Sequence, residues 1–150
     1  MRHGEDMSTQ DGYRIVVGVD GSPPSKAALR WALWQAGLTR GAVNAVMAWD
    51  EPPIYGWELP PELSPKRTTA RKLADTVAEV AAGGDAGAVH RTVVHGNPAR
   101  ALVDESEDAD LLVVGSRGHG GFTGALLGSV SQQCIQHARC PVVVIRQPQP

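Results

Sequence analysis

The stretch DLLVVGSRGHGGFTGALLGSVSQQCIQHA, residues 110–138, carries the clearest fold signal in the chain. It opens on an apolar run, which is typical of a strand that is covered on both faces. A glycine-rich segment follows, and the stretch closes on residues that fit a helix. A buried strand that leads through a loop into a helix is the repeating unit of parallel α/β sheets. The stretch therefore predicts a glycine-rich loop at the carboxyl end of a parallel strand.

The same alternation of strand and helix runs along most of the chain. It predicts strands at residues 13–20, 42–50, 88–96, 110–116 and 140–146, and helices at residues 23–37, 66–82, 98–109 and 130–138. This order indicates an α/β fold, with a doubly wound five-stranded parallel sheet and helices on both of its faces. In such sheets ligands bind beyond the carboxyl ends of the strands, where the strand order reverses. That rule points to the glycine-rich loop.

Individual residues predict where two of the helices begin and end. Ser22 is the expected N-cap of the first helix, with Pro23 at the first helical position and Gly37 at the end. Asn97 and Pro98 are expected to start the third helix in the same way.

Three further segments are expected to lie outside regular structure. Residues 1–12 and 147–150 are predicted to be a flexible leader and tail, which leaves one domain at 13–146. Residues 51–65 hold five prolines and are expected to form an irregular loop. Loops of this length inside a compact domain are often binding loops or lids.

Composition narrows the class of protein. With 150 residues, of which 42% are hydrophobic and 20% charged, the chain fits one globular domain. The formal net charge of −2 gives no general attraction to nucleic acid or to an anionic membrane. The apolar runs are too short to cross a bilayer and the first residues lack a signal-peptide core, so we expect a cytoplasmic protein. Cys134 and Cys140 match no metal motif and are expected to be small, partly buried residues.

The glycine-rich loop has the properties of an anion site. Glycine lets a ligand approach the backbone closely, and a helix start offers unpaired N–H groups and a positive dipole end. Ser129 adds a hydroxyl donor and Arg117 could add charge. The alternative is a glycine-rich turn without a ligand. The loop lacks the lysine of a Walker A motif, and it follows the fourth strand rather than the first, unlike a dinucleotide fingerprint.

Taken together, these features resemble the universal stress protein family, on the branch that binds ATP. That branch carries Gly, two residues, Gly, nine residues, then Gly-Ser or Gly-Thr. The chain has Gly115, Gly118 and Gly128-Ser129 at this spacing. The first strand also ends in VGVDGS, with Asp20 at its tip, and the last strand begins with CPVVVIR.

The resemblance implies a fold and a set of site residues. The fold is adenine nucleotide alpha hydrolase-like, with strand order 3-2-1-4-5. Asp20 would meet the ribose or adenine, and could contact Mg²⁺ on the phosphates, while the main chain of Ala48 would meet adenine. The remaining implied positions, which face the phosphates or ribose, are Gly115, Gly118, Gly128, Ser129 and Val130. From the residues alone, Asp20 could instead shape a turn and Arg117 could be a solvated side chain.

Three functions follow from this interpretation. The first is an ATP-binding sensor or regulator in the stress response, with Mg²⁺ as the expected companion of ATP and a protein partner still to be identified. The second is an enzyme that hydrolyses ATP slowly, although no nucleophile elbow or paired-carboxylate motif supports catalysis. The third is a dimeric interaction protein with an empty loop. The resemblance also implies a homodimer joined through residues 141–146, a terminal apolar strand.

Overall fold

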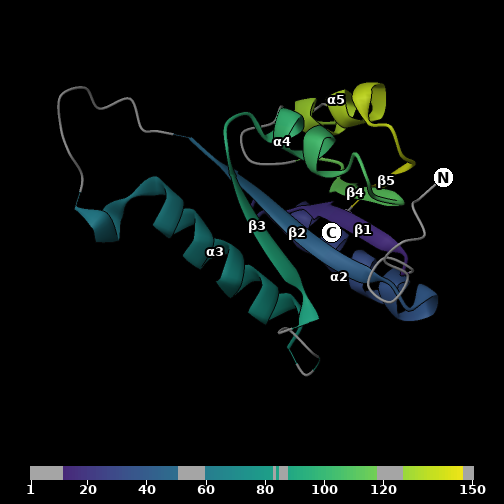
Figure 1. Cartoon of the computed structure of the whole chain (residues 1–150), viewed down its shortest axis with the longest axis horizontal. Coiled ribbons are helices and arrows are strands. Elements are labelled where there is room, and N and C mark those ends of the chain that lie inside the picture. The colour runs from purple at the N-terminus through teal and green to yellow at the C-terminus, as the bar shows by residue number, and fades with distance from the viewer. Residues whose placement is uncertain (1–11, 51–59, 83, 85–87, 118–126, 147–150) are drawn as a thin grey trace, which may run out of the picture.

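The structure is a computed structural model that describes residues 12–50, 60–82, 84, 88–117 and 127–146. The predicted leader and tail fall almost wholly outside these ranges. In chain order the elements are β1 (Arg14–Gly18), α2 (Pro23–Thr39), β2 (Ala42–Trp49), the 3-10 helix η1 (Pro61–Leu63), α3 (Pro65–Val80), β3 (His90–His95), α4 (Pro98–Glu105), β4 (Leu111–Gly115), α5 (Ser129–His137) and β5 (Val142–Ile145). The predicted alternation of strands and helices is thus confirmed (Figure 1).

The five strands form one parallel sheet in the order β3-β2-β1-β4-β5. This order confirms the predicted 3-2-1-4-5 arrangement. The chain winds from β1 outward to β3, returns across the sheet through α4 to β4, and ends at β5. The direction of winding therefore reverses between β1 and β4, which leaves a crevice at the carboxyl ends of these two neighbouring strands.

Helices cover both faces of the sheet. Figure 1 shows α4 and α5 together on one side and α2 and α3 on the other. Alternate residues of each strand point to opposite faces, so Val17 packs with Leu29 of α2 and Leu73 of α3 in one core cluster. Val16 packs with Leu102 of α4 in the other. The buried members of both clusters are at most 9% exposed, so the sheet is packed on both faces.

The end of α2 differs from the prediction. The helix starts at Ser22 and Pro23 as expected, and the Ser22 side chain accepts a hydrogen bond from the Ser25 N–H. It continues past Gly37 to Thr39, and Arg40 takes the left-handed conformation at φ 55°. The N–H of Arg40 donates to the carbonyl of Ala36, which satisfies a carbonyl that the helix end would leave open.

The proline-rich segment is less irregular than expected where it is described. Residues 51–59 lie outside the described part, but Pro61–Leu63 form a 3-10 turn. Helix α3 begins at Pro65, and Ser64 caps it by accepting a hydrogen bond from the Arg67 N–H. Proline at a first helical position loses no hydrogen bond, because that N–H has no partner inside the helix.

Both cysteines are free thiols within the apolar layer between the sheet and α5. Burial, together with the smaller effect of the neighbouring Cys140 thiol, raises the pKa of the Cys134 thiol to about 11. Burial likewise raises the pKa of Cys140. Both groups are therefore protonated near neutral pH and behave as small packing residues.

In the described part of the chain, no helix is long and apolar enough to span a membrane.

Candidate functional site

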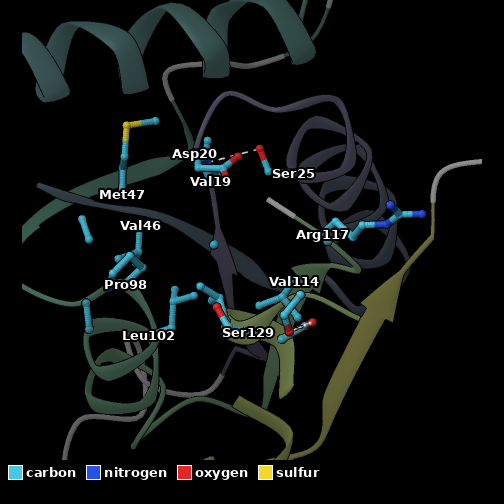
Figure 2. A pocket seen from close by; sticks show the side chains of 17 residues that line it. Val19, Asp20, Ser25, Val46, Met47, Pro98, Leu102, Val114, Arg117 and Ser129 are labelled. Atoms are coloured by element: carbon cyan, nitrogen blue, oxygen red, sulfur yellow. Dashed lines mark hydrogen bonds between the residues drawn. The ribbon is translucent and has the colours of Figure 1, made fainter. Parts of the chain in front are cut away.

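A cavity of about 320 Å³ opens at the crevice between the carboxyl ends of β1 and β4. Its walls come from the strand ends, from the start of α2, from α4 and from the start of α5 (Figure 2). The residues that line it are Gly18, Val19, Asp20, Ser25, Val46, Met47, Ala48, Pro98, Ala101, Leu102, Val114, Gly115, Arg117, Gly128, Ser129, Val130 and Ser131. The site therefore lies where the topology of the sheet predicts it.

Most of the residues singled out from the sequence meet in this cavity. The members that line it are Asp20, Ala48, Gly115, Arg117, Gly128, Ser129 and Val130. They come from four separate segments of the chain, so only the fold brings them together. Gly118 lies outside the described residues.

Asp20 shapes the loop after β1 and also faces the cavity. Its Oδ1 accepts a hydrogen bond from the Ser22 N–H at 2.9 Å, and its N–H donates to Ser25 Oγ at 3.2 Å (Figure 2). Gly21, between them, has a φ of +84°, a left-handed conformation that favours glycine. The turn-forming and cavity-lining interpretations of Asp20 are thus compatible, because the turn fixes the carboxylate on the wall of the cavity.

Ala48 offers main-chain groups to the cavity. Successive peptide groups of a strand face opposite neighbours. The Val46 carbonyl accepts from the Val19 N–H of the β1 side at 2.9 Å, and the Trp49 carbonyl accepts from the Gly96 N–H of the β3 side at 2.8 Å. By this alternation the N–H and the C=O of Ala48 face the β1 side, where β1 ends and the cavity begins. One donor and one acceptor therefore lie side by side on the cavity wall.

The start of α5 differs from the starts of the other α-helices in the described part of the chain. The helices α2, α3 and α4 each carry a proline in the first turn and an N-cap side chain that accepts a backbone N–H. The N-cap of α5 is Gly128, which makes no side-chain cap bond. The N–H groups of the first turn of α5 precede the first intrahelical bond, from the Gln132 N–H to the Gly128 carbonyl. They thus keep their donor capacity and the positive end of the helix dipole.

Gly128 lines the cavity, but its N–H is engaged within the chain. Its N–H donates to the Ser116 carbonyl at 2.6 Å and is therefore already used. The N–H groups of Ser129 and Val130 come next along the helix. Gly128 thus joins the two ends of the glycine-rich segment, and the donors for an anion come from the residues after it.

Two glycines allow close packing around the cavity. A Cβ on Gly115 would lie 2.8 Å from the Pro24 carbonyl carbon, so glycine lets the end of β4 approach the start of α2. A Cβ on Gly18 would lie 2.6 Å from Leu102 Cδ1, so glycine lets α4 approach β1. The first contact is with backbone, which cannot turn aside as a side chain can. Gly115 therefore has a packing role in addition to its place in the motif.

The remaining wall was not predicted from the sequence. Pro98, Ala101 and Leu102 of α4 line the cavity on the same face of the sheet as Val46 of β2, whereas Met47 belongs to the opposite face. They belong to a helix that follows β3, at the far edge of the sheet, and reach the site because α4 crosses back over β2 and β1. The signal for this crossing was the strand order itself, since the connection from β3 to β4 must span two strands.

The lining of the cavity combines apolar side chains of β2 and α4 with polar groups of the loop after β1 and of the start of α5. In Figure 2, Val46 and Pro98 lie at the left of the view, Ser129 lies at the lower centre beside Leu102, and Arg117 lies at the right. The Arg117 guanidinium points away from the other labelled side chains (Figure 2). Asp20 lies at the top of the view, above Ser129 (Figure 2). A lining of this kind suits a ligand that has both a flat apolar group and an anionic group.

Comparison with known proteins is in line with this architecture. The family model described as the universal stress protein family matches residues 13–146. A universal stress protein of Mycolicibacterium smegmatis is 39% identical over an alignment of 153 residues. The match covers 96% of this chain and 49% of that protein. Universal stress protein Rv2623 of Mycobacterium tuberculosis is 38% identical over 147 residues, which cover 97% of this chain and 50% of that protein. The chain thus spans about half the length of the curated relatives it matches.

Solved structures show the same fold. A universal stress protein in complex with cAMP has a TM-score of 0.64 and 28% identity, and the match covers 89% of this chain and 96% of that one. The universal stress protein of Archaeoglobus fulgidus in complex with dAMP has a TM-score of 0.61 and 25% identity, with 89% and 97% covered. The expected adenine nucleotide alpha hydrolase-like fold is confirmed. On the match to the family model and to these relatives, the chain belongs to the universal stress protein family.

Proposed function

We propose that the cavity binds an adenine nucleotide, namely ATP with Mg²⁺, and that the chain acts as a nucleotide-dependent sensor or regulator in the stress response. The observation that carries the proposal is the open start of α5, which places N–H donors on the wall of a cavity that also has an apolar lining from β2 and α4. Two structures of the family, described above, are complexes with cAMP and dAMP, which favours an adenine nucleotide as the ligand.

The phosphates would bind at the start of α5. The N–H groups of Ser129 and Val130 and the Ser129 hydroxyl would donate to phosphate oxygens, and the helix dipole favours a negative charge there. Hydrogen bonds to a charged acceptor are about twice as strong as neutral ones. A sensor further requires that ATP binds one state of the protein more tightly than another, since only differential affinity shifts an equilibrium.

The adenine would bind against Ala48. The Watson–Crick edge of adenine presents an acceptor, N1, beside a donor, the N6 amino group. The Ala48 main chain offers the complementary N–H and C=O on the cavity side of β2. Guanine presents the reverse pattern, a donor at N1 beside the acceptor O6, and would leave both pairs mismatched. Pro98 and Leu102 of α4 would cover the apolar face of the base.

The ribose would then lie near Asp20. The Asp20 carboxylate is suited to accept hydrogen bonds from ribose hydroxyls. Phosphate oxygens and carboxylates are also the hard ligands that Mg²⁺ prefers. A Mg²⁺ ion that arrives with ATP would be held mainly by the phosphates, with Asp20 as the carboxylate on the cavity wall.

Thermal denaturation tests the choice of base. At a concentration of ATP 100 times its Kd, binding to the folded state adds about 2.7 kcal/mol, which raises Tm by about 5–10 °C for a chain of this size. We expect GTP at the same concentration to give a much smaller rise in Tm, because the hydrogen-bonding edge of guanine does not match the N–H and C=O of Ala48. Equal shifts with ATP and GTP would contradict the assignment of adenine to Ala48. No shift with either nucleotide would contradict the proposed function as a whole.

We also propose that the chain forms a homodimer through residues 141–146. Strand β5 lies at the edge of the sheet, and its four residues are all partly exposed. The carbonyls of Pro141 and Ile145 accept bonds from the β4 side, so the peptide N–H of Val144 faces outward. An edge of this kind can pair with the same edge of a second copy.

Sedimentation tests the dimer. We expect the wild-type chain to sediment as a dimer at micromolar concentration and Val144→Pro to sediment as a monomer. Proline at this position removes an outward N–H but no bond to β4, so the variant keeps its sheet. Val144→Thr, which keeps the N–H, is the matched control and should remain a dimer. A wild-type monomer would refute this interface.

A further inference from the structure

Ser131 is hydrogen-bonded to the residues at both described ends of the glycine-rich segment, Ser116 and Gly128. It lies in the first turn of α5 and only 2% of it is exposed. Its Oγ is 2.9 Å from the Gly128 carbonyl oxygen and 3.1 Å from the Ser116 carbonyl oxygen, and donates a hydrogen bond shared between them. The Gly128 N–H donates to the same Ser116 carbonyl. One buried hydroxyl thus links the end of β4 to the start of α5.

These bonds set the direction of peptide groups that face the cavity. In a trans peptide the C=O of one residue and the N–H of the next point to opposite sides of a rigid plane. The Gly128 carbonyl points into the helix, toward the Ser131 hydroxyl and the Gln132 N–H. The Ser129 N–H, on the other side of the same peptide plane, therefore points out of the N-terminal end of the helix. The Ser116 carbonyl is turned toward Ser131 as well, which fixes the plane that carries the Arg117 N–H.

We propose that Ser131 is a positioning residue for the bound phosphate: its buried hydroxyl holds the Gly128 and Ser116 carbonyls away from the anion and so aims the Ser129 N–H at it. The proposal rests on the proposed function, because it names what orients the donors of that site. Without the hydroxyl, the Gly128 carbonyl keeps only the bond from the Gln132 N–H and the Ser116 carbonyl only the bond from the Gly128 N–H, so the Gly128–Ser129 peptide can rock more freely. A rocking peptide brings a carbonyl oxygen, which repels phosphate, toward the position of the donor.

A purely structural role would look different. Serine hydroxyls often bond to the carbonyl three residues earlier in a helix. Ser106, fully buried at the end of α4, makes this bond to the Val103 carbonyl at 3.1 Å and also hydrogen-bonds to Cys140, but it does not line the cavity. Ser131 makes the equivalent bond to Gly128 and adds the bond to Ser116, which lies fifteen positions earlier in the chain. Only the second bond reaches across the loop of the proposed phosphate site.

The test compares two deletions of a buried hydroxyl. Ser131→Ala and Ser106→Ala should each lower the free energy of unfolding, since each removes one buried hydrogen-bonding group. The affinities for ATP and for adenosine are then measured by calorimetry on the folded variants. We expect Ser131→Ala to weaken ATP binding about tenfold, while adenosine binding changes less than about twofold, because adenosine lacks the phosphates. We expect Ser106→Ala to leave both affinities within about twofold of the wild type.

Each other outcome decides against the proposal. If Ser131→Ala binds ATP as the wild type does, or loses ATP and adenosine affinity equally, Ser131 does not position the phosphate donors. If Ser131→Ala does not fold, Ser131→Cys has nearly the same size with a much weaker donor and must show the same selective loss of ATP affinity. If the wild type binds adenosine but ATP no more tightly, Ser131 has no phosphate to position, whereas failure to bind either refutes the proposed function itself.

Discussion

Gly115→Val is expected to lower the free energy of unfolding by about 1–3 kcal/mol, the usual cost of overpacking a tight site, and to abolish nucleotide binding. The added Cβ would lie 2.8 Å from the Pro24 carbonyl carbon and 2.9 Å from both the Pro24 oxygen and Cβ. These atoms belong to the first turn of α2, which is held by the Ser22 cap. The end of β4 and the start of α2 must therefore move apart, and with them two walls of the cavity.

A second glycine gives the control. Gly37 lies within α2, and a Cβ there would meet nothing within 4 Å. Gly37→Ala should therefore stabilise the chain by about 0.5–1 kcal/mol, since alanine loses less conformational entropy in a helix. Urea denaturation measures both effects, and calorimetry with ATP measures binding. A Gly115→Val protein that unfolds at the wild-type urea concentration would show that β4 and α2 are not in close contact.

Ser129→Asp is expected to separate stability from binding. Aspartate at the first position of α5 places a carboxylate at the positive end of the helix dipole, which favours the folded state by about 0.3–1 kcal/mol. The same carboxylate would occupy the region proposed for the phosphates and would repel them. We expect ATP affinity to fall about 100-fold, or about 2.7 kcal/mol, while adenosine affinity stays close to that of the wild type.

The matched variant is Ser129→Ala, which removes the hydroxyl and adds no charge. It should weaken ATP binding only severalfold, because the main-chain N–H groups remain. Calorimetric titration with ATP and adenosine, together with Tm in the absence of ligand, gives both quantities for each variant. If Ser129→Asp binds ATP as well as Ser129→Ala does, the phosphates do not lie at the start of α5.

The parts of the fold that could be predicted are those encoded locally. Apolar runs of strand length and the Ser22-Pro23 and Asn97-Pro98 pairs define elements within a few residues, and the order of elements defines the sheet. The end of α2 could not be predicted in this way. Gly37 is a residue typical of helix ends, yet the helix continues to Thr39 and Arg40 takes the left-handed conformation, with its N–H bonded to the Ala36 carbonyl.

The same distinction applies to the site: features encoded locally could be predicted, and features that depend on the folded chain could not. The spacing of the glycines predicts a phosphate loop, because close approach of a ligand to the backbone favours glycine at particular positions. No sequence pattern distinguishes Ala101 and Leu102 as cavity residues, since they look like the core face of any amphipathic helix. Their place in the cavity depends on the crossing of α4 over β2. The hydroxyl of Ser131 was missed for a related reason, because its bond to Ser116 links positions that only the folded chain brings together.

Calorimetric titration of ATP into nucleotide-free wild-type protein tests the central claim most directly. The account predicts saturable binding of one ATP per chain, and much weaker binding of GTP under the same conditions. Ser129→Asp should bind ATP about 100-fold more weakly than the wild type, while it still binds adenosine. Absence of saturable heat with ATP, from a protein that is folded by circular dichroism, would contradict the assignment of the cavity to an adenine nucleotide.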